Sequence, residues 1–166
     1  MKKILFVVMA IVLTACSGMA TEIPTEIPTE IPTDFPNTNS GDLESARQQW
    51  QEAAISHYRF NLNMVCFCAF SENMPLVVEV QDGNVVSMEY QNGNEIDPAS
   101  LEFFQRYETI DKIFAELEKA VSGEADEVTV SFDDTYGFPE QIDIDFIEEA
   151  IDDELVLTIS GFEVLP

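Results

Sequence analysis

The sequence has little positive charge. Its 166 residues include 7 lysines and arginines against 32 aspartates and glutamates, so the formal net charge is −25. Such an excess of carboxylates repels the phosphates of nucleic acids and anionic lipid headgroups, which argues against nucleic-acid binding. The same charge is compatible with cationic partners.

The sequence also lacks the motifs of common enzyme classes. It contains no G-x-S-x-G, no Walker loop and no H-E-x-x-H. His57 is the only histidine, which removes most nucleophile–base pairs. Paired carboxylates like those of glycoside hydrolases are not evidence here, because such pairs occur by chance among so many acids. We therefore expect no catalytic residues and no cofactor, and we expect a protein that is not an enzyme.

The N-terminal apolar run is short. Ile4–Leu13 is about half of the roughly 20 residues that a membrane-spanning helix needs, and it follows Lys2 and Lys3, as in a secretory signal peptide. Leu13-Thr14-Ala15-Cys16 resembles the bacterial lipobox. This resemblance implies a signal peptide over 1–15 and a Cys16 that carries diacylglycerol and palmitate-type acyl chains, which would anchor the protein to a membrane. An ordinary signal peptide with a chance cysteine is the alternative.

The expected location is the cell envelope. Ser17 follows the cysteine where some lipoproteins have aspartate. By resemblance to enterobacterial sorting, this favours the outer membrane in a cell that has one. Otherwise we expect the outer face of the cell membrane.

A proline-spaced repeat follows the cysteine. "TEIPTEIPTEIPTDFP" places a proline at every fourth residue, which prevents helix and favours extended polyproline-like chain. We interpret 16–41 as the lipidated cysteine and a stalk. The folded domain then covers 42–166.

The whole chain has 46% hydrophobic residues, and the sequence of the domain alternates between helical and strand periods. Asp42 is expected to cap a first helix over 43–56, and Thr109 to cap a second helix that ends at Gly123. Asp82-Gly83 is typical of a hairpin turn. Between Asn92 and Tyr107 we expect a loop with one short turn. The predicted order is α-β-β-β-α-β-β-β, an α+β domain with an antiparallel sheet and two helices on one face.

Cys66 and Cys68 continue the apolar face of the first predicted strand. In a regular strand their Cα atoms would lie about 6.5–7 Å apart, at the limit of disulfide reach. An exported chain favours a disulfide here, at the end of the strand. A reduced buried pair, a redox centre, and a metal site with His57 and an acid remain alternatives. His57 itself is expected at the end of the first helix.

Carboxylates crowd the last third of the chain. No D-x-D-x-D-G loop with a closing glutamate is present, so an EF-hand is excluded. Asp143 and Asp145 alternate with isoleucines and are expected on the solvated face of a strand, and Asp152-Asp153 fits a turn. We expect Tyr136 and Phe138 to pack against the sheet edge, although exposed aromatics there would suit a partner.

The domain resembles DUF6174, an uncharacterised family of bacterial lipoproteins, over nearly all of 45–163. The residues that carry the resemblance are Trp50, Tyr58-Arg59-Phe60, Cys66-Phe67-Cys68, Val80–Val85, Thr109-Ile110-Asp111, Phe114, Phe132-Asp133, Tyr136–Pro139, Ile142–Asp145 and Asp152–Glu154. The family implies no established activity and no catalytic residues.

Together these patterns predict a lipid-anchored module that binds a protein partner at the cell envelope. One alternative is a thiol-redox protein that uses Cys66 and Cys68. The other is an acidic domain that binds divalent cations.

Overall fold

A computed structural model describes residues 40–150 and 152–166. Three α-helices and six strands make up this part of the chain, with a 3-10 turn at Ser71–Asn73 and a π-helical turn at Ala120–Glu124. The elements are α1 (Ser40–Ala53), β1 (His57–Val65), β2 (Leu76–Gln81), β3 (Asn84–Tyr90), α2 (Pro98–Phe104), α3 (Ile110–Lys119), β4 (Glu127–Phe132), β5 (Pro139–Asp145) and β6 (Leu155–Val164). The predicted signal peptide, Cys16 and the stalk as far as residue 39 lie outside the described residues.

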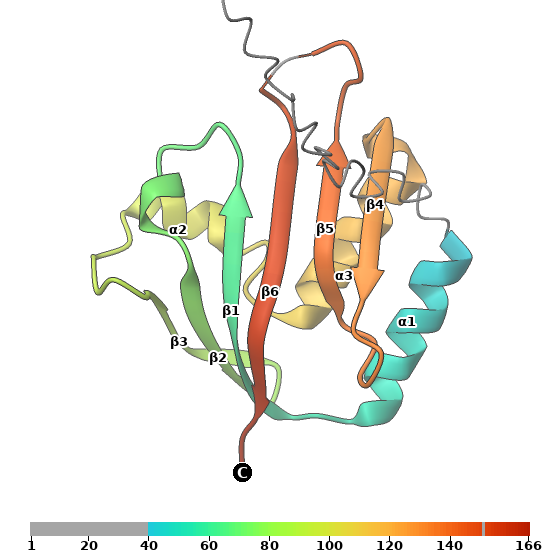
Figure 1. Cartoon of the computed structure of the whole chain (residues 1–166). Helices are drawn as coiled ribbons and strands as arrows, with labels where there is room; N and C mark the ends of the chain where they lie inside the picture. The colour runs from blue at the N-terminus through green and yellow to red at the C-terminus, as the bar shows by residue number, and fades with distance from the viewer. Residues whose placement is uncertain (1–39, 151) are drawn as a thin grey trace, which may run out of the picture. The chain divides into compact units, whose positions relative to one another are not determined.

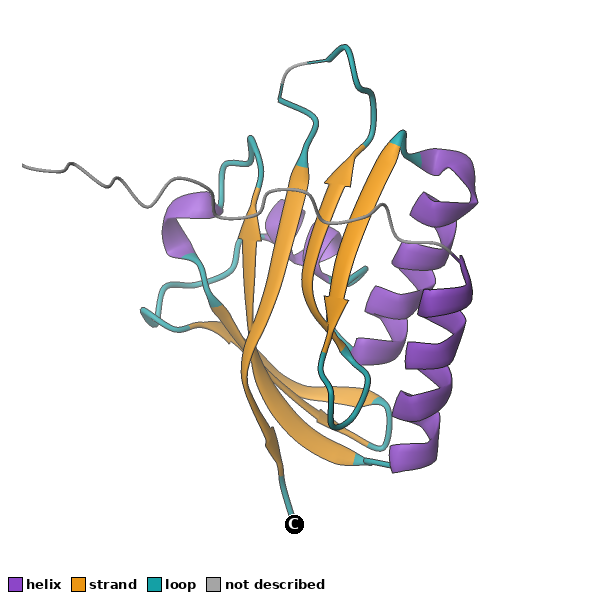
Figure 2. Cartoon of the chain, turned by 45° about the vertical axis from the view of Figure 1, so that its right-hand side comes forward, coloured by secondary structure: helices purple, strands orange, loops and turns teal. Residues whose placement is uncertain are grey.

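The six strands form one antiparallel sheet in the order β3-β2-β1-β6-β5-β4. The helices α1 and α3 lie side by side against one face of it (Figures 1 and 2). The predicted α+β class and antiparallel sheet are confirmed. Among the described residues, no helix is both long enough and apolar enough to span a membrane.

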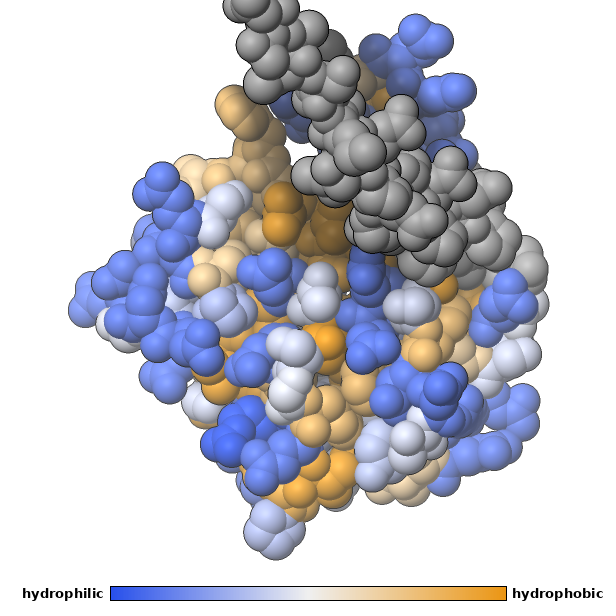
Figure 3. All heavy atoms as spheres, viewed as in Figure 1, coloured by the Kyte–Doolittle hydropathy of each residue, from blue (hydrophilic) through white to orange (hydrophobic). Residues whose placement is uncertain are grey.

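Alternation along the strands separates the two faces of the sheet. On β1, Phe60 and Leu62 are fully buried beneath the helices, whereas Asn61 and Asn63 point to the opposite face. That opposite face is turned toward the viewer in Figure 3 and is mainly hydrophilic, with smaller hydrophobic areas between the polar side chains. The hydrophobic core therefore lies between the sheet and the helices.

The hairpin between β2 and β3 forms where the sequence predicts it. Asp82 and Gly83 both have positive φ, 50° and 75°, as a two-residue turn that matches the twist of its strands requires. The side chain of Asn84 donates to the carbonyl oxygen of Asp82 at 2.9 Å.

The first helix is displaced from its predicted position. It begins at Ser40 and ends at Ala53, so Asp42 lies in the first turn instead of at the N-cap, and the predicted range 43–56 is wrong by three residues at each end. Ala54 has φ 49°, a left-handed conformation that stops a helix. Leu43, Ala46 and Trp50 still form its buried face.

The second helix that the sequence predicts corresponds to α3, and it agrees better with the structure than the first. Thr109 caps α3, its Oγ1 accepting from the amide of Lys112 at 3.2 Å. The α-helix ends at Lys119, and the π-helical turn that follows contains Gly123 at φ 113°.

The sequence prediction missed α2. Asp97 is its N-cap and accepts from the amides of Ala99 at 3.0 Å and Ser100 at 3.1 Å. Pro98 occupies the first helical position, where a missing amide proton costs nothing. The Asp-Pro pair is therefore a helix start, where the prediction had a loop.

Candidate functional site

The Cys66-Phe67-Cys68 segment lies just beyond β1, which ends at Val65. The two sulfur atoms are 2.03 Å apart in a disulfide, and the Cα atoms are 5.2 Å apart. The prediction that both cysteines continue the strand is wrong. An extended strand would hold the Cα atoms about 6.5–7 Å apart. The chain bends instead, and the amide of Cys68 donates to the carbonyl oxygen of Cys66 at 2.8 Å.

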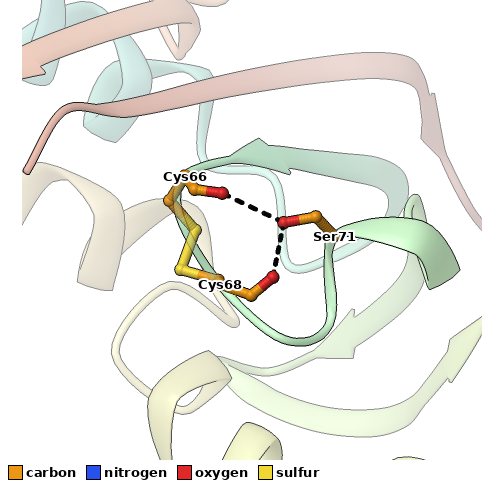
Figure 4. The surroundings of a disulfide bond; sticks show 3 residues. All are labelled: Cys66, Cys68 and Ser71. Carbon is orange, nitrogen blue, oxygen red and sulfur yellow. Dashed lines mark hydrogen bonds between the residues drawn. A yellow bond between two sulfur atoms is a disulfide. The ribbon is translucent and has the colours of Figure 1, made fainter. Parts of the chain in front are cut away.

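Ser71 holds the disulfide loop from inside. Its hydroxyl lies 3.1 Å from the carbonyl oxygen of Cys66 and 2.9 Å from that of Cys68, and its single proton is shared between these two acceptors (Figure 4). The amide of Ser71 also donates to Cys68 O at 3.3 Å. One serine at the start of the 3-10 turn thus fixes both ends of the three-residue ring.

Phe67 at the apex of this loop is 85% exposed. Val65 and Ile147, at the ends of β1 and β5, are each 56% exposed. Both β1 and β5 run antiparallel to β6, so they end where β6 begins. This is the upper end of the sheet in Figure 1. Apolar side chains therefore gather in solvent at one end of the sheet.

A pocket of about 180 Å³ lies at this end, which we call the pocket end. Its lining comes from the disulfide loop, from α2 and the segment after it, and from the connection between β5 and β6. The lining residues are Cys66, Phe67, Cys68, Phe103, Arg106, Tyr107, Phe146, Asp152, Asp153, Glu154 and Leu155. Aromatic rings, a disulfide, one cation and three carboxylates thus share one concave surface.

Arg106 is already bound within the domain. Its Nε donates to Glu116 Oε2 at 3.0 Å, its Nη2 pairs with the same oxygen, and its guanidinium lies 5.4 Å from the ring centre of Tyr107. Burial acts to raise the pKa of Glu116. Hydrogen bonds from Lys119 and Arg106 outweigh it and hold that pKa below its ordinary value. The positive charge in the pocket lining is thus largely balanced by Glu116.

Asp153 is in a different position. Both of its carboxylate oxygens are buried, and neither has a hydrogen-bond partner among the residues that the structure describes. Its neighbour Asp152 has φ 80°, in agreement with the predicted turn before the last strand.

His57 is not at the end of the first helix, as predicted, but is the first residue of β1. It therefore lies at the opposite end of that strand from the cysteines. Its Nδ1 is 2.8 Å from the carbonyl oxygen of Pro166, and its Nε2 is 3.1 Å from Glu79 Oε1. The hydrogen bond to Pro166, followed by that to Glu79, raises the pKa of His57.

Among the described residues, no arrangement of side chains supports the alternative of a metal site. The structure does not bring His57 to Cys66 and Cys68. No group of three or more histidine, cysteine, aspartate or glutamate side chains suited to a metal ion occurs within residues 40–150 and 152–166.

The other carboxylates singled out by the sequence serve the backbone or face solvent. Asp143 is exposed on β5, and Asp145 Oδ1 accepts from the amide of Ile147 at 3.1 Å. Asp133 Oδ1 accepts from the amides of Thr135 at 3.0 Å and Tyr136 at 2.6 Å. These acids shape turns and a solvated face.

The aromatics of the β4–β5 turn pack inward, as expected. Phe138 is 4% exposed and stacks on Phe162 with ring centres 4.5 Å apart. Tyr136 contacts the same ring at 5.7 Å. They form part of the core at the other end of the sheet.

Sequence reasoning missed four members of the pocket: Phe103, Arg106, Tyr107 and Phe146. Phe103 lies in the missed helix α2, and Arg106 and Tyr107 lie in the turn that follows it; the ring centres of Phe103 and Tyr107 are 5.5 Å apart. Phe146 lies one residue beyond β5, which ends at Asp145. Recognising Asp97-Pro98 as a helix start would have placed Phe103 on a helix and Arg106 and Tyr107 directly after it.

The architecture defines a small α+β domain with a single antiparallel sheet and a disulfide-closed loop beside a pocket. Residues 42–164 match the model of a family described as "Family of unknown function (DUF6174)", and the chain belongs to this family. Comparisons with curated proteins and with solved structures found no match.

Proposed function

We propose that this protein is a lipid-anchored module of the bacterial cell envelope that binds a partner through the pocket end of its domain. The anchor is proposed from the lipobox-like Leu13–Cys16. The binding surface rests on one observation: Phe67, 85% exposed, stands at the apex of a disulfide-closed loop beside a pocket with aromatic walls.

An exposed aromatic side chain on a fixed loop suits binding. Large aromatic residues contribute much of the free energy of protein interfaces, and a preorganised loop loses little conformational entropy when it binds. The disulfide and the two hydrogen bonds from Ser71 provide that preorganisation. Val65 and Ile147 extend the apolar surface at the same end.

The binding surface can be tested in living cells by replacing Phe67 with p-benzoylphenylalanine in the full chain. Irradiation should give discrete adducts of higher mass. The matched control carries the same photoreactive residue at Val86, which is 52% exposed on the edge strand β3, away from the pocket. Equal adducts at both positions, or none at position 67, would contradict the proposal.

The anchor has a separate test. The full chain should incorporate a labelled fatty acid and sediment with membranes, and Cys16→Ser should abolish both. If the C16S chain is labelled and sediments like the unsubstituted chain, the anchor is wrong.

A second candidate function is thiol–disulfide exchange. Its motive is that Cys66 and Cys68 are only half-buried and line the pocket together with Arg106. A nearby guanidinium favours a thiolate, and the pairing of Arg106 with Glu116 reduces this effect. A thiolate of a substrate dithiol would attack one sulfur, break the Cys66–Cys68 bond and release the other cysteine as a thiolate. The second substrate thiolate would then resolve the mixed disulfide, leaving the substrate oxidised and the cysteine pair reduced.

Reaction of the full chain with glutathione tests this candidate. Mass spectrometry should detect a mixed disulfide at Cys66 or Cys68. Arg106→Gln should slow its formation, whereas Arg59→Gln, which removes a guanidinium on the opposite face of the sheet, should leave the rate unchanged. A pair that never exchanges removes the candidate.

A further inference from the structure

Within residues 40–150 and 152–166, the carboxylates of the pocket have no cationic partner. Each of the lysines and arginines among the described residues already pairs with another acid. These pairs are Arg47–Glu118, Arg59–Glu163, Arg106–Glu116, Lys112–Glu108 and Lys119–Glu116. His57 pairs with Glu79. None of these cations reaches Asp152, Asp153 or Glu154.

Asp153 makes this imbalance costly. Its two buried oxygens accept no hydrogen bond, and a buried polar group without a partner loses free energy that a donor would restore. A charged donor satisfies a carboxylate better than a neutral one does. The pocket is thus short of a positively charged N–H group.

The remaining walls favour a cation with an apolar part. Phe103, Tyr107 and Phe146 line the same pocket, and aromatic faces attract ammonium and guanidinium groups as well as alkyl chains. The volume of about 180 Å³ is smaller than the roughly 300–1,000 Å³ typical of sites for drug-sized ligands. It suits a single extended side chain or a small amine.

We infer that the pocket binds an organic cation, an ammonium or guanidinium group on a short apolar chain, with Asp153 as its principal acceptor. The cation comes either from a free small amine or from a basic side chain of a partner polypeptide. This inference rests on the proposed binding function and names the chemistry that its pocket recognises. Arg106 is paired with Glu116 and does not satisfy Asp153, whose buried carboxylate must turn toward the pocket to accept from the ligand.

The test uses the full chain in a zwitterionic detergent and follows backbone amide resonances by NMR. The probes are cadaverine and a blocked Gly-Lys-Gly peptide. Gly-norleucine-Gly is the control peptide, because it has a similar alkyl chain without the ammonium group. Both cationic probes should shift the amides of residues 66–68 and 152–155, and the norleucine peptide should not.

Asp153→Asn removes the charge and keeps the shape. It should weaken binding of the tighter cationic probe roughly ten- to hundredfold. Asp134→Asn makes the same change of charge in the exposed β4–β5 turn, at the other end of the sheet, and should bind as the unsubstituted chain does. The melting temperature of D153N should not fall, because the Asp153 oxygens have no donor to lose.

Tighter binding of the lysine peptide would assign the cation to a partner polypeptide, and tighter binding of cadaverine to a small amine. The inference is overturned if neither probe shifts the pocket amides, if norleucine binds equally well, or if D153N and D134N behave alike. Should the probes fail while photo-crosslinking at position 67 persists, only the cation is wrong and the binding function stands.

Discussion

The two ends of the sheet use aromatic side chains in opposite ways. Where β1 begins, Trp50 contacts Tyr58, Phe138 and Phe162 edge-on, with ring centres 5.4, 6.4 and 6.0 Å away. We call Trp50, Tyr58, Tyr136, Phe138 and Phe162 the closed end. At the pocket end, Phe103 and Tyr107 line a cavity instead, and Phe67 lies in solvent. The closed end buries its aromatic rings in the core, and the pocket end exposes one ring at the surface where we propose that a partner binds.

The sharpest test of this contrast compares Trp50→Ala with Phe67→Ala. The first removes a side chain that is 5% exposed, and it should lower the free energy of unfolding by about 3–5 kcal/mol. The second removes a ring that is 85% exposed and should change it by less than about 0.5 kcal/mol. Urea denaturation of both variants measures the difference. Similar losses would refute the contrast between the two ends.

Gly137 gives the next largest effect. It has φ 78°, and a Cβ there would lie 2.6 Å from Ala46 O and 2.8 Å from Gln49 Cβ, so the β4–β5 turn could not keep its contact with α1. Gly137→Ala should cost about 2–4 kcal/mol.

The control for this position is Gly93→Ala. Gly93 has nearly the same φ, 77°, but nothing lies within 4 Å of the added Cβ. It should cost only about 1 kcal/mol, the penalty of the left-handed backbone alone. Equal losses in thermal or urea unfolding would show that the turn is not packed tightly on α1.

The disulfide should contribute less than the closed end does. Because Cys66 and Cys68 are two residues apart, closing their loop restricts the unfolded chain little. Replacing both by alanine should lower the free energy of unfolding by about 1–2 kcal/mol. A reductant should destabilise the unsubstituted chain by a similar amount and leave the double variant unaffected. A larger effect of the reductant on the double variant would contradict this assignment.

The smallest expected effect is the pH dependence of the domain's stability that arises from His57, at the start of β1. Its Nδ1 and Nε2 both face acceptors, the Pro166 carbonyl first and Glu79 second, which raises the pKa of His57 above 6.5. The folded state therefore binds the proton more tightly than the unfolded state does. This contribution is complete below about pH 6.5 and is lost as the pH rises through the folded-state pKa.

The melting temperature, measured from pH 5.5 to pH 9, should decline in this window in the unsubstituted chain. The decline should be reduced in His57→Gln. A variant with the same pH profile as the unsubstituted chain would show that the two hydrogen bonds do not favour the imidazolium.

Predictability differs along the chain for physical reasons. The period-two pattern of β1, the Asp82-Gly83 turn and the Thr109 cap are set by local chemistry, and the structure agrees with all three. The C-terminal limit of α1 was wrong because Ala54 adopts a left-handed conformation that alanine rarely takes.

The candidate site was less predictable than the fold. The cysteine pair is visible in the sequence, but Phe103, Phe146 and Asp153 meet only through the order of the strands. No spacing along the chain brings residues 66, 103 and 153 together. The one local signal available was the helix start at Asp97-Pro98, which was not recognised.

The place of β6 in the sheet has a consequence for how the domain assembles. It follows every other strand in the chain, yet it lies between β1 and β5. Until it arrives, β1–β3 and β4–β5 are separate ribbons with no ladder joining them. A chain whose last strand is held back, in a ribosome or in a translocation channel, cannot close its sheet. The sheet of this domain is therefore complete only after β6 has paired with both β1 and β5.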